Sequence, residues 1–236
     1  MSVLSERARQ FLGPRVTARL RCLLRGYPLP RWGNLRRTTP LSGTFGFERG
    51  TPVDRYYLHR FLDDHRALIT GDVLEVQTNS YTKRFGHDLG RTDSFDIVPL
   101  FNPTYLIDLG HSERVLPEAA YDCVLLPQTL PHLRELDLCL SQAMRVVRPG
   151  GVILASAGCL IPLTGDMPDY WRLSPDGWRE KLASAWPGAE VNGHGNCLSA
   201  VAAQLGLALE ELSDAELAVH DPRYPVVTTI VCRKPR

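Results

Sequence analysis

The sequence lacks several features that would assign it to a particular class of protein. No apolar run reaches the roughly 18 residues that a transmembrane helix needs. The opening residues, M-S-V-L-S-E-R-A-R-Q, have no apolar core of the kind found in a secretory signal. The net charge is +1, so the whole chain has no overall field that would attract nucleic acid or an anionic membrane. We therefore expect a cytoplasmic protein with no transmembrane segment and no nucleic acid partner.

The cysteines and histidines form none of the spacings that bind structural metals. There is no C-x-x-C, H-x-x-x-H or H-E-x-x-H pattern, and the six cysteines are scattered along the chain. Most of them lie inside apolar runs, as buried thiols do in a reducing compartment. We therefore predict reduced cysteines and no structural metal.

Length and composition fit one large domain with an appendage. Of the 236 residues, 44% are hydrophobic and 22% are charged, which is typical of a globular protein with a sizeable core. Positions 2–41 differ from the rest, because they hold nine arginines and a single acid, Glu6. We predict a basic helical extension over residues 1–45 and a folded domain over residues 46–236.

The extension is predicted to contain a short basic amphipathic helix that ends at Gly26. Such a helix fits several roles: a solvated helix lying on the domain, a contact with an anionic membrane surface, a site for a protein partner or a second copy of the chain, or a transit peptide. Its apolar positions are Val16, Leu20, Leu23 and Leu24.

The rest of the chain alternates apolar strands with helices. Residues 71–86 begin with a turn and the strand G-D-V-L-E-V, then continue as a loop and a helix. A helix is predicted over 131–147 and another from Ser174. This order indicates an α/β fold with a mostly parallel sheet covered on both faces. The other predicted strands are 94–99, 104–108, 121–126, 152–157, 190–196 and 226–232.

Glu75 is a candidate site residue before any family is considered. A carboxylate at the carboxyl end of a buried parallel strand is costly unless donors surround it, and ligands of α/β sheets bind at that edge. Earlier in the chain, Arg55 and Tyr56 lie on a predicted helix. They either close over a ligand or serve only in packing and in a surface ion pair.

Three segments resemble class I S-adenosylmethionine-dependent methyltransferases, especially the type 11 group. The segments are V-L-E-V at 73–76, Y-D-C-V-L-L-P-Q-T-L-P-H-L at 121–133 and V-V-R-P-G-G-V-I-L-A at 146–155. D-Y-W-R-L-S-P-D-G-W resembles a further segment of that group. The resemblance implies a Rossmann-like sheet of seven mostly parallel strands, with an antiparallel last strand and helices on both faces. S-adenosyl-L-methionine would lie across the carboxyl ends of the first strands.

The resemblance also implies roles for particular residues. Glu75 matches the acid that ends the first strand, and Asp108 matches the acid that meets the adenine amine. Gln128 and Thr129 match the positions that flank the methyl-transfer site. The cofactor-binding residues expected are Arg55, Tyr56, Glu75, Gln77, Tyr81, Asn102, Asp108, Leu109, Gln128 and Thr129.

Two features depart from the family's pattern. The usual loop E-x-G-x-G-x-G is replaced by E-V-Q-T-N-S-Y-T, with no glycine before Gly86, although a subgroup with a T-Y-T-x-R-F-G-like loop shares this departure. The predicted end of the second strand, near Pro99, has no acid for the ribose hydroxyls, so Asn102 would replace one contact. The chain after Val76 must therefore turn tightly without glycine. The methyl-donor interpretation fails if Tyr81 or a neighbouring side chain fills the space above the sheet while Glu75 makes only internal contacts.

Methyl transfer needs alignment of the reactants and exclusion of water, and a hydroxyl acceptor also needs a base. His132 is the candidate base, since it follows the Gln128 loop; it could instead cap a helix or bond a carbonyl. Candidate substrate contacts are Asp166, Tyr170 and Arg172 in the long loop over 161–173, and His194.

We expect a methyltransferase that acts on a small molecule, by O-methylation of a sugar or a secondary metabolite. The alternative is a methyltransferase-fold protein that has lost this chemistry and serves as a binding or scaffold partner or catalyses another reaction. A nicotinamide-dependent reductase is disfavoured, because no G-x-G-x-x-G follows the first strand.

Overall fold

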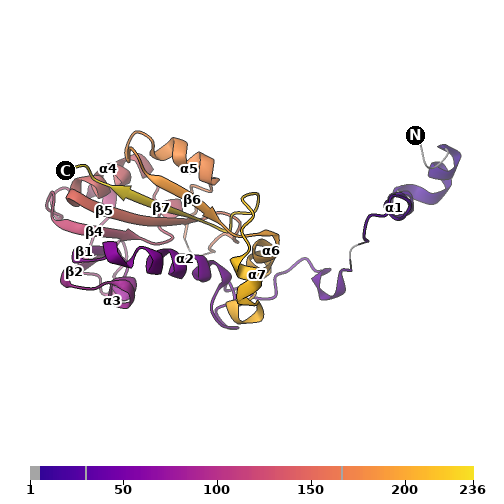
Figure 1. The fold of residues 1–236 in the computed structure, drawn as a ribbon, viewed down its shortest axis with the longest axis horizontal. Coiled ribbons are helices and arrows are strands. Elements are labelled where there is room, and N and C mark those ends of the chain that lie inside the picture. Colours follow the sequence, from indigo (N-terminus) through magenta and orange to yellow (C-terminus); the bar gives the residue numbers. More distant parts are fainter. Residues whose placement is uncertain (1–5, 30, 166) are drawn as a thin grey trace. The chain divides into compact units, whose positions relative to one another are not determined.

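The computed structural model describes residues 6–29, 31–165 and 167–236. The chain divides into two compact units, Met1–Thr39 and Pro40–Arg236 (Figure 1). The first unit holds α1 (Glu6–Leu24), which is interrupted at Gly13 by a φ of 68° and a ψ of 162°, and the 3-10 helix η1 (Gly33–Leu35). Glycine adopts this backbone conformation without the steric cost of a Cβ. The division falls between residues 39 and 40, earlier than the boundary after residue 45 suggested by the sequence.

Residues 40–52 belong to the second unit because they bond to its last helices. The Leu41 amide donates to the Leu205 carbonyl at 2.8 Å, and the Thr51 amide donates to Glu210 at 2.9 Å. Arg49 is ion-paired with Glu211. These contacts fix the chain just before α2 (Val53–Asp64), whose first turn contributes to the site described below.

The second unit is built on one seven-stranded sheet with the order β3-β2-β1-β4-β5-β7-β6. β7 runs antiparallel to both of its neighbours, whereas the other pairs are parallel. The predicted Rossmann-like, mostly parallel seven-stranded sheet is thus confirmed. The strands are β1 (Gly71–Val76), β2 (Leu89–Asp96), β3 (Tyr105–Leu106), β4 (Tyr121–Leu126), β5 (Val147–Gly158), β6 (Glu190–His194) and β7 (Val227–Arg233).

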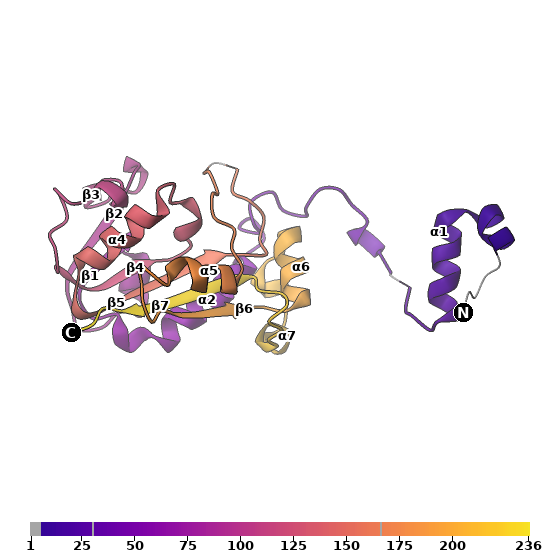
Figure 2. The ribbon, with the colours of Figure 1, turned by 90° about the horizontal axis from the view of Figure 1, so that it is seen from above.

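Helices cover both faces of the sheet, as the views in Figures 1 and 2 show. Successive residues of a strand point to opposite faces. Accordingly Val124 packs in the core beneath α4 (Leu136–Val146) and α5 (Pro175–Leu182), while Cys123 and Leu125 pack in the core beneath α2 and α3 (Ser80–Phe85). The remaining helices are α6 (Cys197–Leu205), α7 (Asp214–Ala218), η2 (Arg66–Leu68), η3 (Pro99–Phe101), η4 (Leu109–His111), η5 (Leu130–His132) and η6 (Leu209–Glu211).

Several predicted boundaries were wrong. β2 ends at Asp96, because Pro99 begins the 3-10 helix η3 and a proline has no amide for a sheet ladder. β3 is only two residues long. The helix predicted over 131–147 is split into η5 and α4, since the chain is extended at Leu133. The helix predicted from Ser174 is α5, with Ser174 as its N-cap.

The six cysteines are all free thiols, of which Cys123, Cys139 and Cys232 are buried and Cys197 is exposed. Burial raises the pKa of Cys139 to about 12 and that of Cys232 to about 11, so both thiols are protonated at neutral pH. A protonated buried thiol is a poor nucleophile and a poor metal ligand. These two cysteines therefore act as core residues.

Candidate functional site

The candidate residues from the first four strands follow one another along the carboxyl edge of the sheet. The Gln77 amide after β1 donates to the Phe95 carbonyl of β2 at 2.7 Å. The Ile107 amide after β3 donates to the Asp96 carbonyl at 2.8 Å. On the other side, β1 pairs with β4, which leads into Gln128. This edge is where open α/β sheets bind ligands.

Glu75 holds the loop after β1 against the start of α3. It is 1% exposed, and its Oε1 accepts from the Tyr81 amide at 3.1 Å. Its Oε2 accepts from the Thr82 amide and from the Thr82 hydroxyl, both at 2.7 Å. Burial raises the pKa of Glu75, while the donors of Thr82 and Tyr81 oppose this shift. Both oxygens thus accept hydrogen bonds inside the domain, and Glu75 thereby shapes the loop.

Gln77 supplies the sharp turn that a glycine provides in the usual loop. Its φ is 68°, in the left-handed region, and the next amide, of Thr78, donates back to the Val76 carbonyl at 2.8 Å. A non-glycine residue in this region is under strain of order 1 kcal/mol, and such residues gather at ligand sites. The chain after Val76 therefore turns tightly without glycine, as the interpretation from the sequence required.

Tyr81, in the first turn of α3, lies toward α2. Its ring is half-buried, with its centroid 5.9 Å from that of His59 and 6.3 Å from that of Phe85. Burial, with help from Arg84 and Arg55, lowers the pKa of His59 to about 4, so this imidazole is neutral at pH 7. Of the two conditions that together would exclude a methyl donor, the internal engagement of Glu75 is met. For the other, the half-buried Tyr81 ring packs against the core beneath α2.

Gln128 is fixed after β4 by two hydrogen bonds. Its φ is 51°, and its amide donates to the buried hydroxyl of Ser156 on β5 at 2.8 Å. Its side-chain Nε2 donates to Asp54 Oδ2 at 3.0 Å, and the same oxygen is ion-paired with Arg55 at 2.9 Å. The first turn of α2 is thereby joined to the end of β4, and three residues come together: Asp54, Arg55 and Gln128. Asp54 was not predicted as a site residue. In the sequence, an acid in the first turn of a helix is explained by its favourable interaction with the helix dipole, and nothing distinguishes a buried one.

Asp96 is the acid that the sequence analysis missed. It ends β2, is half-buried, and its Oδ1 accepts from the amides of Ile97 at 2.7 Å and Val98 at 3.2 Å. No residue in the described part of the chain donates to its Oδ2. An acid does stand at the end of the second strand, so the expectation that none was present there was wrong, while the role of Asn102 stays a prediction. The pair Phe95-Asp96 is the pattern of an apolar strand residue followed by an acid. The apolar residues that follow Asp96 made the predicted strand continue beyond it.

Asp108 and Leu109 follow β3 beside Asp96. Asp108 caps η4, accepting from the Gly110 amide on Oδ1 at 2.8 Å, and its side chain is otherwise exposed. Leu109 is buried beneath it. Asn102 ends η3 in the left-handed conformation, with a φ of 48°, and is also exposed.

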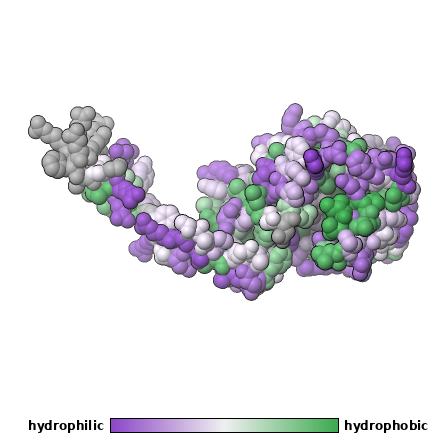
Figure 3. Space-filling model, turned by 180° about the vertical axis from the view of Figure 1, so that it is seen from behind, coloured by the Kyte–Doolittle hydropathy of each residue, from purple (hydrophilic) through white to green (hydrophobic). Residues whose placement is uncertain are grey.

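Large apolar side chains are exposed next to these acids. From behind, the surface of the domain carries an apolar patch (Figure 3). Leu100 is the most exposed of them, at 75%. The exposed apolar residues between β2 and the end of β3 are Ile97, Val98, Leu100, Phe101 and Leu106.

His132 lies in η5, directly after the Gln128 turn. Its Nδ1 is 2.9 Å from the Pro168 carbonyl, which makes Nδ1 the protonated nitrogen and leaves Nε2 as a possible proton acceptor. The carbonyl bond was one of the two structural roles considered for this residue. Tyr170 is close by, since its amide donates to the Pro131 carbonyl at 2.7 Å, and its ring is exposed. Thr129 is buried and donates to the Pro127 carbonyl, so its hydroxyl supports the turn.

Three predicted site residues have other partners. The Arg172 guanidinium bonds to carbonyls of residues 159–162 and to Asp169, so it holds its own loop together. His194, on β6, bonds Thr229 at 2.7 Å and stacks on Tyr57; β6 is three strands from β4, roughly 14 Å at the usual spacing. Its role as a substrate contact stays a prediction. Tyr56 bonds Arg60 and packs on Tyr57. Asp166 lies outside the described residues.

Both a family profile and a solved structure relate this domain to methyltransferases. The family profile described as "Methyltransferase domain" matches residues 105–155, from β3 through β4 to most of β5. A SAM-dependent methyltransferase from Archaeoglobus fulgidus superposes with a TM-score of 0.52 at 13% identity, over 76% of this chain and 94% of that one. The domain has the fold of a class I methyltransferase. The resemblance found in the sequence is confirmed.

A second structure shares this methyltransferase fold. Phosphoethanolamine N-methyltransferase 2 from Haemonchus contortus, solved with S-adenosyl-L-methionine, superposes with a TM-score of 0.54 at 13% identity. The match covers 75% of this chain and 53% of that one. A comparison with curated protein sequences gave no match. Within residues 6–29, 31–165 and 167–236, no three His, Cys, Asp or Glu side chains are grouped so that they could hold a metal ion.

Proposed function

We propose that this protein is an S-adenosyl-L-methionine-dependent methyltransferase of the cytoplasm that methylates a small molecule, on an oxygen of a sugar or a secondary metabolite. The observation that carries the proposal is the row of polar groups along the carboxyl edge of β3, β2, β1 and β4. The match to the methyltransferase domain over residues 105–155 supports it.

The residues at this edge fit the parts of S-adenosyl-L-methionine. Asp96 keeps one oxygen for the ribose hydroxyls while its other oxygen holds the loop. Asp108 presents an exposed carboxylate to the adenine amine, and the apolar side chains of Val98 and Leu100 suit the flat faces of the ring. The tight turn at Gln77 lets backbone approach the methionine part, with Arg55 available for its carboxylate. When bound, the cofactor supplies an electrophilic methyl group.

The acceptor side is formed by the segment after β4. Gln128, fixed from both sides, borders the methyl-transfer position. His132 Nε2 accepts the proton of an acceptor hydroxyl, while the Pro168 carbonyl keeps the ring in the required tautomer. Tyr170, next to it, is a substrate contact. The loop that Arg172 holds together helps to exclude water from this side.

A ligand titration tests the proposal. We expect S-adenosyl-L-methionine and its demethylated product to raise the melting temperature in a concentration-dependent way, because a ligand that binds only the folded state stabilises it. NAD and NADP serve as controls and should have no effect. A response to dinucleotides alone would instead indicate a reductase.

The alternative is a methyltransferase-fold protein that serves as a binding partner. The full engagement of Glu75 inside the domain and the absence of loop glycines favour it. Under this alternative, the folded protein responds to neither S-adenosyl-L-methionine nor its product in the same titration.

Asp96→Asn is expected to weaken binding of S-adenosyl-L-methionine about ten- to a hundredfold, measured by isothermal titration calorimetry. The amide oxygen still accepts from the amides of Ile97 and Val98, so the loop is kept while the charge-assisted bonds, worth about 1.5–3 kcal/mol, are lost. Asp63→Asn, on the exposed face of α2, is the matched control and should leave the affinity unchanged. Equal affinities of Asp96→Asn and the wild type would show that Asp96 does not contact the cofactor.

A further inference from the structure

The charges of the chain are divided unequally between its two units. Residues 1–39 contain nine arginines and one glutamate, a net charge of +8. Residues 40–236 contain 18 basic and 25 acidic residues, a net charge of −7. The overall charge of +1 therefore conceals a strongly basic unit and an acidic domain. From Gly13 to Thr39 there is no aspartate or glutamate, so seven arginines have no counter-charge within this stretch.

The last part of α1 arranges these arginines around an apolar face. At about 100° per residue, Val16, Leu20, Leu23 and Leu24 fall within one arc of roughly 100°. Arg15 and Arg19 border that arc on one side, and Arg21 and Arg25 lie beyond the other side. Leu23 and Leu24 are 57% and 59% exposed, so the other described residues of the first unit leave this face uncovered.

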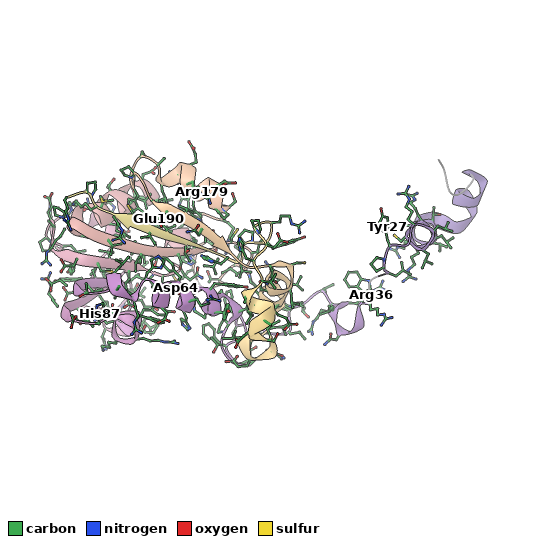
Figure 4. The ribbon with its side chains drawn as sticks, in the orientation of Figure 1. Tyr27, Arg36, Asp64, His87, Arg179 and Glu190 are labelled. Atoms are coloured by element: carbon green, nitrogen blue, oxygen red, sulfur yellow. The ribbon has the colours of Figure 1, made fainter. Side chains whose placement is uncertain are left out.

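The segment after α1, up to Thr39, also combines arginines with exposed apolar and aromatic side chains. Tyr27 is 59% exposed and Trp32 is 50% exposed, and both side chains alternate with arginines. In Figure 4, the labelled side chains of Tyr27 and Arg36 extend from the backbone of this segment. The exposed apolar residues from Tyr27 onward are Tyr27, Leu29, Trp32 and Leu35.

We propose that Gly13–Thr39 docks on the surface of an anionic phospholipid bilayer. Arginine binds lipid phosphates, the leucine face enters the boundary between headgroups and acyl chains, and tryptophan and tyrosine prefer that boundary. The phosphates of a nucleic acid would pair with the arginines, but a nucleic acid has no apolar layer that could bury Leu23, Leu24, Leu29 and Leu35. None of the described helices is long and apolar enough to cross a membrane, so the binding is at the surface.

The proposal is tested by sedimenting the full chain with large unilamellar vesicles. We expect binding to vesicles of equal parts phosphatidylcholine and phosphatidylglycerol, weakening as salt is raised, and no binding to phosphatidylcholine alone. Arg15→Gln with Arg19→Gln should weaken binding about thirtyfold, because each arginine near an anionic surface contributes a factor of about five. Leu23→Ser with Leu24→Ser should weaken it at least tenfold through the lost apolar burial.

Matched substitutions in the acidic domain provide the control. Leu198→Ser and Arg66→Gln replace exposed residues of the same types and should leave vesicle binding unchanged. Two results would overturn the proposal. In the first, the leucine substitutions do not alter vesicle binding and duplex DNA abolishes it. This would mean that the segment binds the phosphates of nucleic acid. The other is a lipid-free dimer that the leucine substitutions dissociate, which would assign the face to a second copy of the chain.

Discussion

Glu75→Ala is expected to lower the free energy of unfolding by about 3 kcal/mol. The substitution leaves three donors without an acceptor: the amides of Tyr81 and Thr82 and the Thr82 hydroxyl, which is fully buried. An unsatisfied buried donor costs about 1–3 kcal/mol. Removing the carboxylate also removes the cost of burying it, which offsets part of the loss. The free-energy cost of the three unsatisfied donors is larger than the gain from no longer burying the carboxylate.

Urea denaturation measures this loss. The midpoint should fall with an unchanged slope, since the compactness of the folded state is kept. Glu75→Gln retains one acceptor oxygen and should lose less than Glu75→Ala. Glu113→Ala, an exposed glutamate outside the sheet, is the control and should stay within about 0.5 kcal/mol of the wild type. A Glu75→Ala midpoint equal to that of the control would mean that the loop after β1 is held by other contacts.

His132→Asn is expected to lower kcat for methyl transfer to a hydroxyl about 10²–10⁴-fold, the usual contribution of a general base. Asparagine can still donate to the Pro168 carbonyl through its amide, but it has no nitrogen that accepts a proton. The acceptor for the assay is a sugar or secondary metabolite that supports turnover of the wild type. Turnover is followed as formation of the demethylated cofactor, and the affinity for S-adenosyl-L-methionine should not change.

His87→Asn is the control for this experiment. His87 is exposed and precedes β2, so it lies at the amino edge of the parallel strands, away from the site; Figure 4 labels it. Its replacement should leave kcat unchanged. If the His132→Asn variant had the wild-type kcat, the role of His132 would be limited to its hydrogen bond with the Pro168 carbonyl, and another residue would be the base.

The sheet and part of the site could be predicted from the sequence because they depend on local patterns. The apolar residues of β1, β4 and β5 identify buried parallel strands, and the acids Glu75 and Asp108 lie near the ends of β1 and β3. Asp96 could not be placed in the same way. Ile97 and Val98 continue the apolar run beyond it, and only the pairing with β1 and β3 shows where the ladder stops.

The partners of several site residues could not be predicted, because they are distant in sequence. His194 bonds Thr229, which is 35 residues away, and Gln128 bonds Asp54, which is 74 residues away. No local pattern reports such pairs. The left-handed conformations of Gln77 and Gln128 were also hidden, because the preference of glycine for these angles is not an absolute requirement.

The opposite signs of the two units bear on how the protein behaves during purification. The isoelectric point of the intact chain is about 7.7, close to the pH of common buffers. A single proteolytic cut near Thr39 would release an acidic fragment that an anion exchanger retains, while the intact molecule elutes. Chromatography on such a resin would therefore report the integrity of the arginine-rich segment without any lipid being present.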